Sequence, residues 1–531
     1  MLIYEIFKNY EMLFFDATIK ESIMSLNEVS IIFPEIFFVL SILFLILHGA
    51  LLCTNKSKNY PLIQNSILNL GILILIFTFI LVCNNLILLK YSFFNSTIIM
   101  DNLTISSKQC ILIASIICLL AIQEYLNDQK INSFEYILLI LFAIFGLILL
   151  CSANDLITAY LAIEVQSLSF YLLAAYKKNS VFSTESGLKY FVLGAFSSSM
   201  FLLGSSLIYG TTGTTNFEDC KDLFFYAYPG SFLIEDCNEF SQILNLNLLQ
   251  FGFLFLLISL FFKLALAPFH IWSPDIYEGS LTSSTIFFAI VPKLSLFILL
   301  VRFFQCSFYG FIDNWRYCFV IVAVLSIIVG SFAGLEQRKI KSLLAYSSIS
   351  HMGYSLLAFS TGTLEGIQVL FSYLLIYILS GLCIWSIFLT LRLKNNYLQK
   401  GNKDLSDFVL LVKSNSVMAI FFSTVLLSLA GFPPLIGFYV KLNIFLSVIE
   451  STMFFSATIS IICSVISTFY YIRIIKVLYF EKGLVGNLYH PIKYKNALTI
   501  GFCFFLFIIL FLNPNILYFY SYKMCLIEYP L

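Results

Sequence analysis

Residues 252–279 read GFLFLLISLFFKLALAPFHIWSPDIYEG. The segment begins as an apolar helix long enough to enter a bilayer, and it then carries Lys263, Pro268 and His270. A lone ammonium group at membrane depth costs at least about 2.5–3.5 kcal/mol. A helix broken by proline is tolerated in hydrocarbon only where protein or water covers the freed carbonyl groups. Both costs in one segment predict a polar cavity with a titratable lysine, as ion or proton movement requires.

The composition of the whole chain predicts an all-α, polytopic membrane protein. Of its 531 residues, 60% are hydrophobic and 11% are charged, far from the proportions of a soluble domain. A bilayer core of about 30 Å needs about 20 apolar residues per helix, and apolar runs of that length recur along nearly the whole chain. The net charge of +1 excludes a nucleic-acid-binding surface.

About fourteen transmembrane helices are predicted. Their expected bounds are 31–52, 62–89, 109–125, 134–151, 156–176, 187–209, the opening stretch at 252–279, 282–304, 317–335, 340–359, 365–391, 417–448, 453–479 and 497–520. A long, acidic loop is expected at 210–245, before helix 7.

Helix 12 is predicted to be broken as helix 7 is. Residues 427–445, LSLAGFPPLIGFYVKLNIF, hold Gly431, Pro433, Pro434 and Lys441. Because the broken helices are five helices apart and five is odd, a repeated five-helix unit would insert upside down the second time. The expected organisation is an N-terminal extension (1–30), helices 1–3 (31–125), a first repeat (134–305), an inverted second repeat (316–480), and helix 14 with a tail (496–531).

Loop charges and the start of the chain predict location and orientation. Most lysines and arginines outside the helices follow odd-numbered helices, which places those loops on the inner side and both termini on the opposite side. The first 28 residues contain acidic residues and no clean signal-peptide core, so insertion without a cleaved presequence is expected. With the Phe-, Ile- and Asn-rich composition, this favours the mitochondrial inner membrane, with termini in the intermembrane space, over a bacterial plasma membrane.

Thirteen cysteines are scattered without a CxxC motif, which argues against metal clusters and c-type haem. No metal site is predicted. Cys220 and Cys237 share the long polar loop. They could form a disulfide if that loop faces an oxidising compartment, and otherwise they are two free thiols.

Four ionisable residues lie well inside predicted helices: Glu164 in helix 5, Lys263 in helix 7, Lys293 in helix 8 and Lys441 in helix 12. Ionisable groups at such depth are functional by default, although a structural role is the alternative. A carboxylate that pairs with a lysine and then separates from it would switch the lysine between holding and releasing a proton. This is a plausible element of a pump.

Lys189, His270 and His351 are secondary candidates for a proton relay. Histidine exchanges protons near neutral pH and could pass them between lysines. The structural alternatives are that Lys189 reaches the interface from the start of helix 6 and that His351 is a hydrogen-bonded packing residue. Asp275 and Glu278 are expected at the inner edge of the membrane.

Residues 262–297, FKLALAPFHIWSPDIYEGSLTSSTIFFAIVPKLSLF, resemble the most characteristic segment of the antiporter-like subunits of respiratory complex I, NADH:ubiquinone oxidoreductase. The segments YLAIEVQSLSFYLLAA, LLAYSSISHMGY and LSLAGFPPLIGFYVKLNIF match the same family in order and spacing. The resemblance implies fourteen helices with inverted repeats. By motif position it implies a lysine-pairing glutamate at Glu164, a pumping lysine at Lys263, a connecting lysine at Lys293, an outlet lysine at Lys441 and a channel histidine at His270.

The resemblance also implies a proton-translocating subunit of the membrane arm. No flavin, iron–sulfur cluster or quinone is expected in this chain; NADH, FMN, iron–sulfur clusters and ubiquinone would be used elsewhere in the complex. The expected partners are other membrane-arm subunits, including neighbouring antiporter-like subunits, and membrane lipids. Two alternatives stay open: a cation/proton antiporter subunit, and a non-pumping scaffold subunit of a membrane complex.

Overall fold

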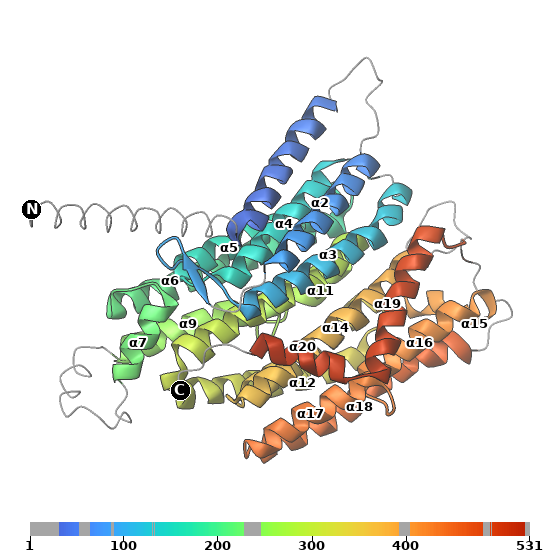
Figure 1. Cartoon of the computed structure of the whole chain (residues 1–531). Helices are drawn as coiled ribbons and strands as arrows, with labels where there is room; N and C mark the ends of the chain where they lie inside the picture. Colours follow the sequence, from blue (N-terminus) through green and yellow to red (C-terminus); the bar gives the residue numbers. More distant parts are fainter. Residues whose placement is uncertain are drawn as a thin grey trace, which may run out of the picture.

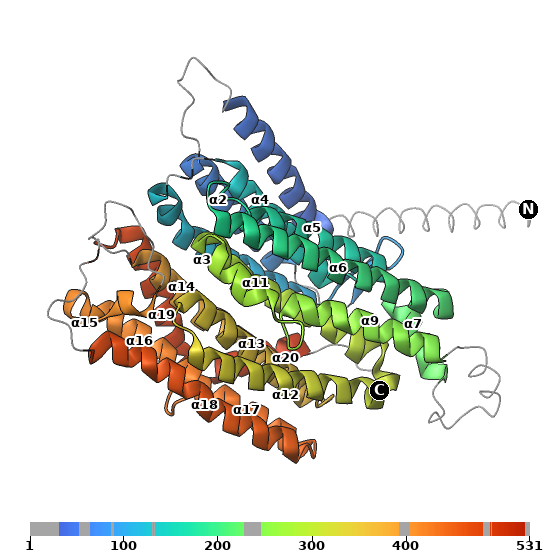
Figure 2. The same ribbon diagram turned by 180° about the vertical axis from the view of Figure 1, so that it is seen from behind.

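The computed structural model describes residues 31–52, 64–85, 90–129, 131, 133–227, 246–391, 404–481, 489 and 491–525. It is a bundle of long helices that run alongside one another (Figure 1, and from behind in Figure 2). Within the described part, twelve helices are long and apolar enough to cross a membrane. The predicted class, an all-α multi-pass membrane protein, is confirmed.

The first elements are the helix Ile31–Leu52, α2 (Gln64–Asn84), β1 (Tyr91–Phe93), β2 (Ile98–Met100), α3 (Asn102–Asp128), α4 (Glu135–Ser152), α5 (Leu156–Ala174), α6 (Val181–Thr212), α7 (Phe217–Ala227), α9 (Leu246–Leu264), α10 (Trp272–Gly279) and α11 (Thr282–Leu300). They are followed by η2, a π-helical turn (Val301–Ser307), η3 (Tyr309–Phe311), α12 (Ile312–Glu336), α13 (Ile340–Phe359), α14 (Leu364–Thr390), η4 (Leu405–Phe408), α15 (Leu411–Ser414), α16 (Ser416–Ala430), α17 (Ile436–Glu450), α18 (Phe454–Tyr479), α19 (Tyr494–Leu512) and α20 (Asn515–Cys525).

The element order follows the predicted order. In addition to the twelve long apolar helices, α13 lies where helix 10 was expected, and α16 with α17 lies where the broken helix 12 was expected. The exact number of membrane crossings and the inverted repeats stay predictions.

α11 forms the centre of the bundle. Every residue from Ser283 to Leu300 is buried, and the helix packs against α3, α4 and α14. A polar residue on α11 therefore meets only protein, which is the environment in which a buried charge needs specific partners.

Two helices begin earlier than their hydropathy predicts. α3 begins at Asn102 rather than at 109, because Asp101 and Thr104 form a reciprocal capping box: each backbone N–H donates to the other's side-chain oxygen at 2.8 Å. α6 begins at Val181 rather than at 187, and its polar first turns hold the Glu185–Lys189 ion pair. Apolarity alone located the membrane core of each helix and missed its polar start.

The predicted loop 210–245 is partly helical. α7 occupies Phe217–Ala227; Glu218 and Asp219 in its first turn favour a helix N-terminus. Its Phe224 packs against Phe308, with ring centroids 5.0 Å apart. Three acidic residues of the predicted loop, Glu218, Asp219 and Asp222, instead belong to a short amphipathic helix. Cys220 is buried in α7, but Cys237 lies outside the described residues, so their pairing stays a prediction.

The chain differs from the prediction at two more places. The last predicted helix, 497–520, is two helices, α19 and α20, because Pro514 cannot continue α19. The antiparallel hairpin β1–β2 pairs Tyr91 with Met100 and was not anticipated. Three consecutive residues at its tip, Phe94–Ser96, have positive φ.

The connections between helices gather at two faces of the bundle. The odd-loop face holds the connections that follow the odd-numbered predicted helices, and the even-loop face holds those that follow the even-numbered ones. On the odd-loop face, the Lys341 ammonium donates to the carbonyl of Ser280 at 2.7 Å. On the even-loop face, the side-chain amides of Asn154 and Asn216 donate to the carbonyl of Ser96 at 2.8 and 3.0 Å. These contacts follow the alternation that a multi-pass chain requires.

Candidate functional site

The first break in the membrane interior separates α9 from α10. α9 ends at Leu264, Ala265 has φ +59°, and the Ala267–Pro268 peptide bond is cis. The indole of Trp272 donates to the carbonyl of Phe262 at 2.9 Å, which satisfies one acceptor that the break frees. Lys263 therefore sits in the last turn of α9, where a helix C-terminus favours a cation.

Lys263 bonds to a tyrosine in this conformation. Its ammonium donates to the Tyr171 hydroxyl at 3.4 Å. Glu164 lies two turns before Tyr171 on α5 and accepts from the Ser167 hydroxyl at 3.4 Å, while its Oε1 is buried without a hydrogen-bond partner among the described residues. The predicted ion pair between Glu164 and a lysine is thus open here, with a carboxylate oxygen unoccupied.

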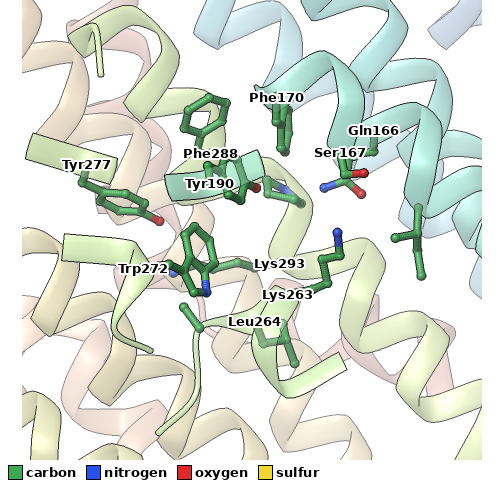
Figure 3. Close-up of a pocket in the computed structure, with 13 residues that line it drawn as sticks. Gln166, Ser167, Phe170, Tyr190, Lys263, Leu264, Trp272, Tyr277, Phe288 and Lys293 are labelled. Atoms are coloured by element: carbon green, nitrogen blue, oxygen red, sulfur yellow. The ribbon is translucent and has the colours of Figure 1, made fainter. Parts of the chain in front are cut away.

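Lys263 and Lys293 line one cavity. Figure 3 shows the Lys263 side chain directed towards Ser167 and Gln166 across this space. The space that water centres can occupy is about 20 Å³, which is room for about one water molecule. A single water is enough to connect two groups that do not touch.

Lys293 is held by α14. Its side chain is 5% exposed, and its ammonium donates to the Tyr377 hydroxyl at 2.8 Å. That hydroxyl donates onward to the carbonyl of Ala289 at 3.2 Å, one turn earlier on α11. The acceptor of this buried ammonium group is therefore a neutral oxygen.

His351 lies between two tyrosine hydroxyls. Its Nδ1 is 2.6 Å from the Tyr373 hydroxyl and its Nε2 is 3.0 Å from the Tyr471 hydroxyl. A neutral imidazole has one donor and one acceptor nitrogen, so one tyrosine donates to the ring and the other accepts from it. A change of tautomer reverses both hydroxyls, which lets this triad carry a proton in either direction.

Lys441 is held at the second break. Its ammonium donates to the carbonyls of Leu429 and Ala430, at 2.7 and 3.1 Å, which are the acceptors freed where α16 ends. Gly431 has φ +89°, and a Cβ there would lie 3.1 Å from the Lys441 Cδ. Lys441 and His351 line one small cavity with Tyr373 and Tyr377.

Two predicted residues lie apart from these contacts. Lys189 is nearly half exposed and bonds to Glu185 and Asp275, each at 2.9 Å. His270 follows the first break; its Nδ1 is buried without a partner among the described residues, and its ring centroid is 6.5 Å from that of Tyr346.

The structure places the other four residues one after another: Lys263, Lys293, His351 and Lys441. We call these four residues the lysine row.

Sequence reasoning missed the hydroxyl partners of the row. The four partners are tyrosines that no motif or pattern in the sequence singles out: Tyr171, Tyr377, Tyr373 and Tyr471. It also missed the buried ion pair Lys108–Glu35, because Lys108 was placed before helix 3 rather than inside it. The capping box at Asp101 is the signal that would have extended that helix.

Two broken helices and a row of buried lysines define the class of antiporter-like transport proteins. The family model described as NADH:quinone oxidoreductase/Mrp antiporter, TM, matches residues 153–467. The chain belongs to this family, and the resemblance found in the sequence is confirmed.

The comparisons also show which members of this family the chain is similar to. NADH-ubiquinone oxidoreductase chain 2 of Marchantia polymorpha is 38% identical over 495 residues, 93% of this chain and 98% of that protein. NADH-quinone oxidoreductase subunit N of Pelagibacter ubique is 38% identical over 92% of this chain and 98% of its own. A chain of respiratory complex I from Thermus thermophilus superposes with a TM-score of 0.73 at 25% identity, covering 91% of this chain and 98% of that one. A chain of the Mrp complex from Dietzia shares the fold at 16% identity.

Proposed function

We propose that this chain is a proton-translocating, antiporter-like subunit of the membrane arm of an NADH:ubiquinone oxidoreductase. The observation that carries the proposal is the lysine row, in which each lysine has a neutral oxygen acceptor and a small cavity beside it. The relatives support the proposal because the match covers nearly the full length of each of them.

The row suggests how protons move. When the Glu164 carboxylate approaches Lys263, the pair favours the ammonium form; when it withdraws, only the Tyr171 hydroxyl faces the lysine and the proton can leave. Once Lys293 has released its own proton towards His351, it accepts the proton of Lys263 across the shared cavity. From there it reaches His351 and finally Lys441, which the second break holds.

We place the redox chemistry outside this chain. NADH, FMN, iron–sulfur clusters and ubiquinone belong to other parts of the complex in this proposal, and their reaction would drive Glu164 towards or away from Lys263. The neighbours of this chain would be other membrane-arm subunits, including antiporter-like ones, and lipids. The two five-helix units, 134–305 and 316–480, would be inverted repeats, with a break in each.

We assign the chain to the mitochondrial inner membrane, with the odd-loop face on the matrix side and both termini in the intermembrane space. The basic residues of the odd loops support this orientation. A cysteine introduced at Lys493 should react with an impermeant thiol reagent only when the matrix side is accessible.

The experiment that tests the proposal is purification of the tagged chain from its own membrane, with mass spectrometry of the proteins that co-migrate. We expect flavin-binding and iron–sulfur subunits in a large assembly that oxidises NADH. A small assembly without redox centres, together with sodium-driven proton flux, would favour the cation/proton antiporter. A tagged, unrelated multi-pass protein from the same membrane is the control for co-migration.

A further inference from the structure

Outside the lysine row, the structure holds a buried lysine in direct contact with a carboxylate. The Lys108 ammonium on α3 donates to Glu35 Oε1 of the helix Ile31–Leu52 at 2.5 Å. Lys108 is 1% exposed and Glu35 is 8% exposed. Neither residue lies in the segment that the family model matches, and neither belongs to the two proposed repeats.

The pair is incompletely hydrogen-bonded. Besides Glu35, the ammonium of Lys108 contacts the Met100 Sδ at 3.2 Å, and sulfur is a weak acceptor. Glu35 Oε2 is buried and has no hydrogen-bond partner among the described residues. A permanently charged buried pair repays its desolvation only when its remaining donors and acceptors are satisfied, and this pair leaves a carboxylate oxygen free.

The same arrangement occurs at Glu164. There too a helical carboxylate has one buried oxygen without a hydrogen-bond partner among the described residues, and it interacts electrostatically with the partly buried Lys263. Both carboxylates can therefore accept a proton at an oxygen that no other group occupies.

The pair is linked to the helix of Lys293 through a second ion pair. Arg302, which follows α11, donates to both oxygens of Asp101 at 2.8 and 2.9 Å and to the carbonyl of Cys151 at 3.2 Å. Asp101 caps α3 two turns before Lys108. The Cys151 thiol on α4 interacts electrostatically with Lys108, Arg302 and Asp101, so these groups lie close to one another.

The position of the pair suggests which side it serves. Glu35 is four residues from the start of its helix, and that end lies near the β1–β2 hairpin (Figures 1 and 2). Met100, at the end of β2, covers Lys108. The pair therefore lies near the even-loop face.

We propose that Glu35 and Lys108 form a second proton-holding site, near the even-loop face and separate from the lysine row. The ligand is a proton. In the resting state the carboxylate and the ammonium are both charged; uptake of one proton at Glu35 Oε2 forms the O–H bond and leaves a neutral acid beside a protonated lysine, a net gain of one positive charge. Release of that proton to water restores the pair.

Infrared difference spectroscopy of the purified resting assembly at two pH values tests this site. Because no NADH is added, the result does not depend on the proposed pumping function. We expect a carbonyl band of a buried carboxylic acid that appears at the lower pH. Glu35→Gln should lose this component, and Glu164→Gln, which removes the carboxylate near Lys263, should keep it.

If Glu35→Gln does not assemble, Glu35→Asp keeps an acid at the site and should retain the component at a shifted frequency. A component that survives Glu35→Gln, or that is missing from the unaltered protein, would mean that the pair is a static tether between two helices and would overturn the proposal.

Discussion

Neutral oxygens accept the hydrogen bonds of all three lysines in the row. The acceptors are the Tyr171 hydroxyl for Lys263, the Tyr377 hydroxyl for Lys293, and backbone carbonyls for Lys441. A carboxylate acceptor adds charge–charge attraction to the hydrogen bond of an ammonium group, whereas a hydroxyl or carbonyl oxygen does not. The lysines of the row can therefore release protons at lower cost than they could from a closed ion pair.

At the residue scale we predict that Tyr373→Phe impairs proton transfer at His351. The change keeps the ring but leaves a buried imidazole nitrogen without its partner at 2.6 Å, a loss of about 1–3 kcal/mol. The measurement is the number of protons moved per NADH oxidised, in the assembled complex reconstituted in vesicles, and we expect it to fall.

Tyr354→Phe is the matched control, since the Tyr354 hydroxyl is equally buried but donates to the carbonyl of Ser460 rather than to His351. An equal effect of both substitutions would indicate a packing defect and contradict the role of Tyr373.

The charged members of the row were predictable and the hydroxyls were not. A lysine such as Lys263 within an apolar run is rare enough to be noticed. A tyrosine is not: the chain has 31 of them, and each fits an interface or a core equally well. The partners of His351 come from α14 and α18, so they are known only once those helices are packed around α13.

The second broken helix depends on a glycine at its break. Gly431 combines φ +89° with close contact to the Lys441 side chain. Its neighbour Gly437 allows α17 to approach Ser428, whose carbonyl would lie 1.8 Å from an added Cβ. The same local packing thus ends α16 and positions the Lys441 side chain.

At the element scale we predict that Gly431→Ala, which adds only one methyl group, impairs both the stability of the assembly and proton movement. A left-handed backbone costs an alanine about 1–2 kcal/mol, and the new methyl group would lie 3.1 Å from the Lys441 Cδ, so the side chain that bonds to the carbonyl acceptors must shift. We expect a lower thermal stability of the purified assembly and fewer protons moved per NADH.

Gly501→Ala is the control, because a Cβ at that position on α19 meets nothing within 4 Å. If both variants match the unaltered protein in thermal stability and in protons moved per NADH, neither quantity depends on the contact between Gly431 and Lys441.

Proline and glycine made both breaks predictable, whereas the short elements were hidden. Pro268 and the Pro433–Pro434 pair marked where α9 and α16 end. In contrast, α7 and the hairpin β1–β2 are stabilised by distant groups, such as the amides of Asn154 and Asn216 that bind Ser96. No local pattern announces contacts of that kind.

For the whole molecule, hydropathy was sufficient to predict the class and the order of the helices, because a bilayer dictates both the length and the apolarity of a crossing. It could not show how the first three helices attach to the rest. The ion pair between Asp101, which caps α3, and Arg302, which follows α11, contributes to that attachment together with the packing of α3 against α11. Its two partners lie 201 residues apart.

The most direct test of the central claim is the proton-to-NADH ratio of the complete complex after Lys293→Met. The substitution removes the cation at the middle of the row and keeps an apolar side chain of similar length. We predict that the complex assembles and oxidises NADH, with the proton flux through this subunit lost, while Lys493→Met, at an exposed lysine of the odd-loop face, leaves the ratio unchanged. An unchanged ratio in the assembled Lys293→Met complex would contradict proton movement through the row and leave this chain a scaffold.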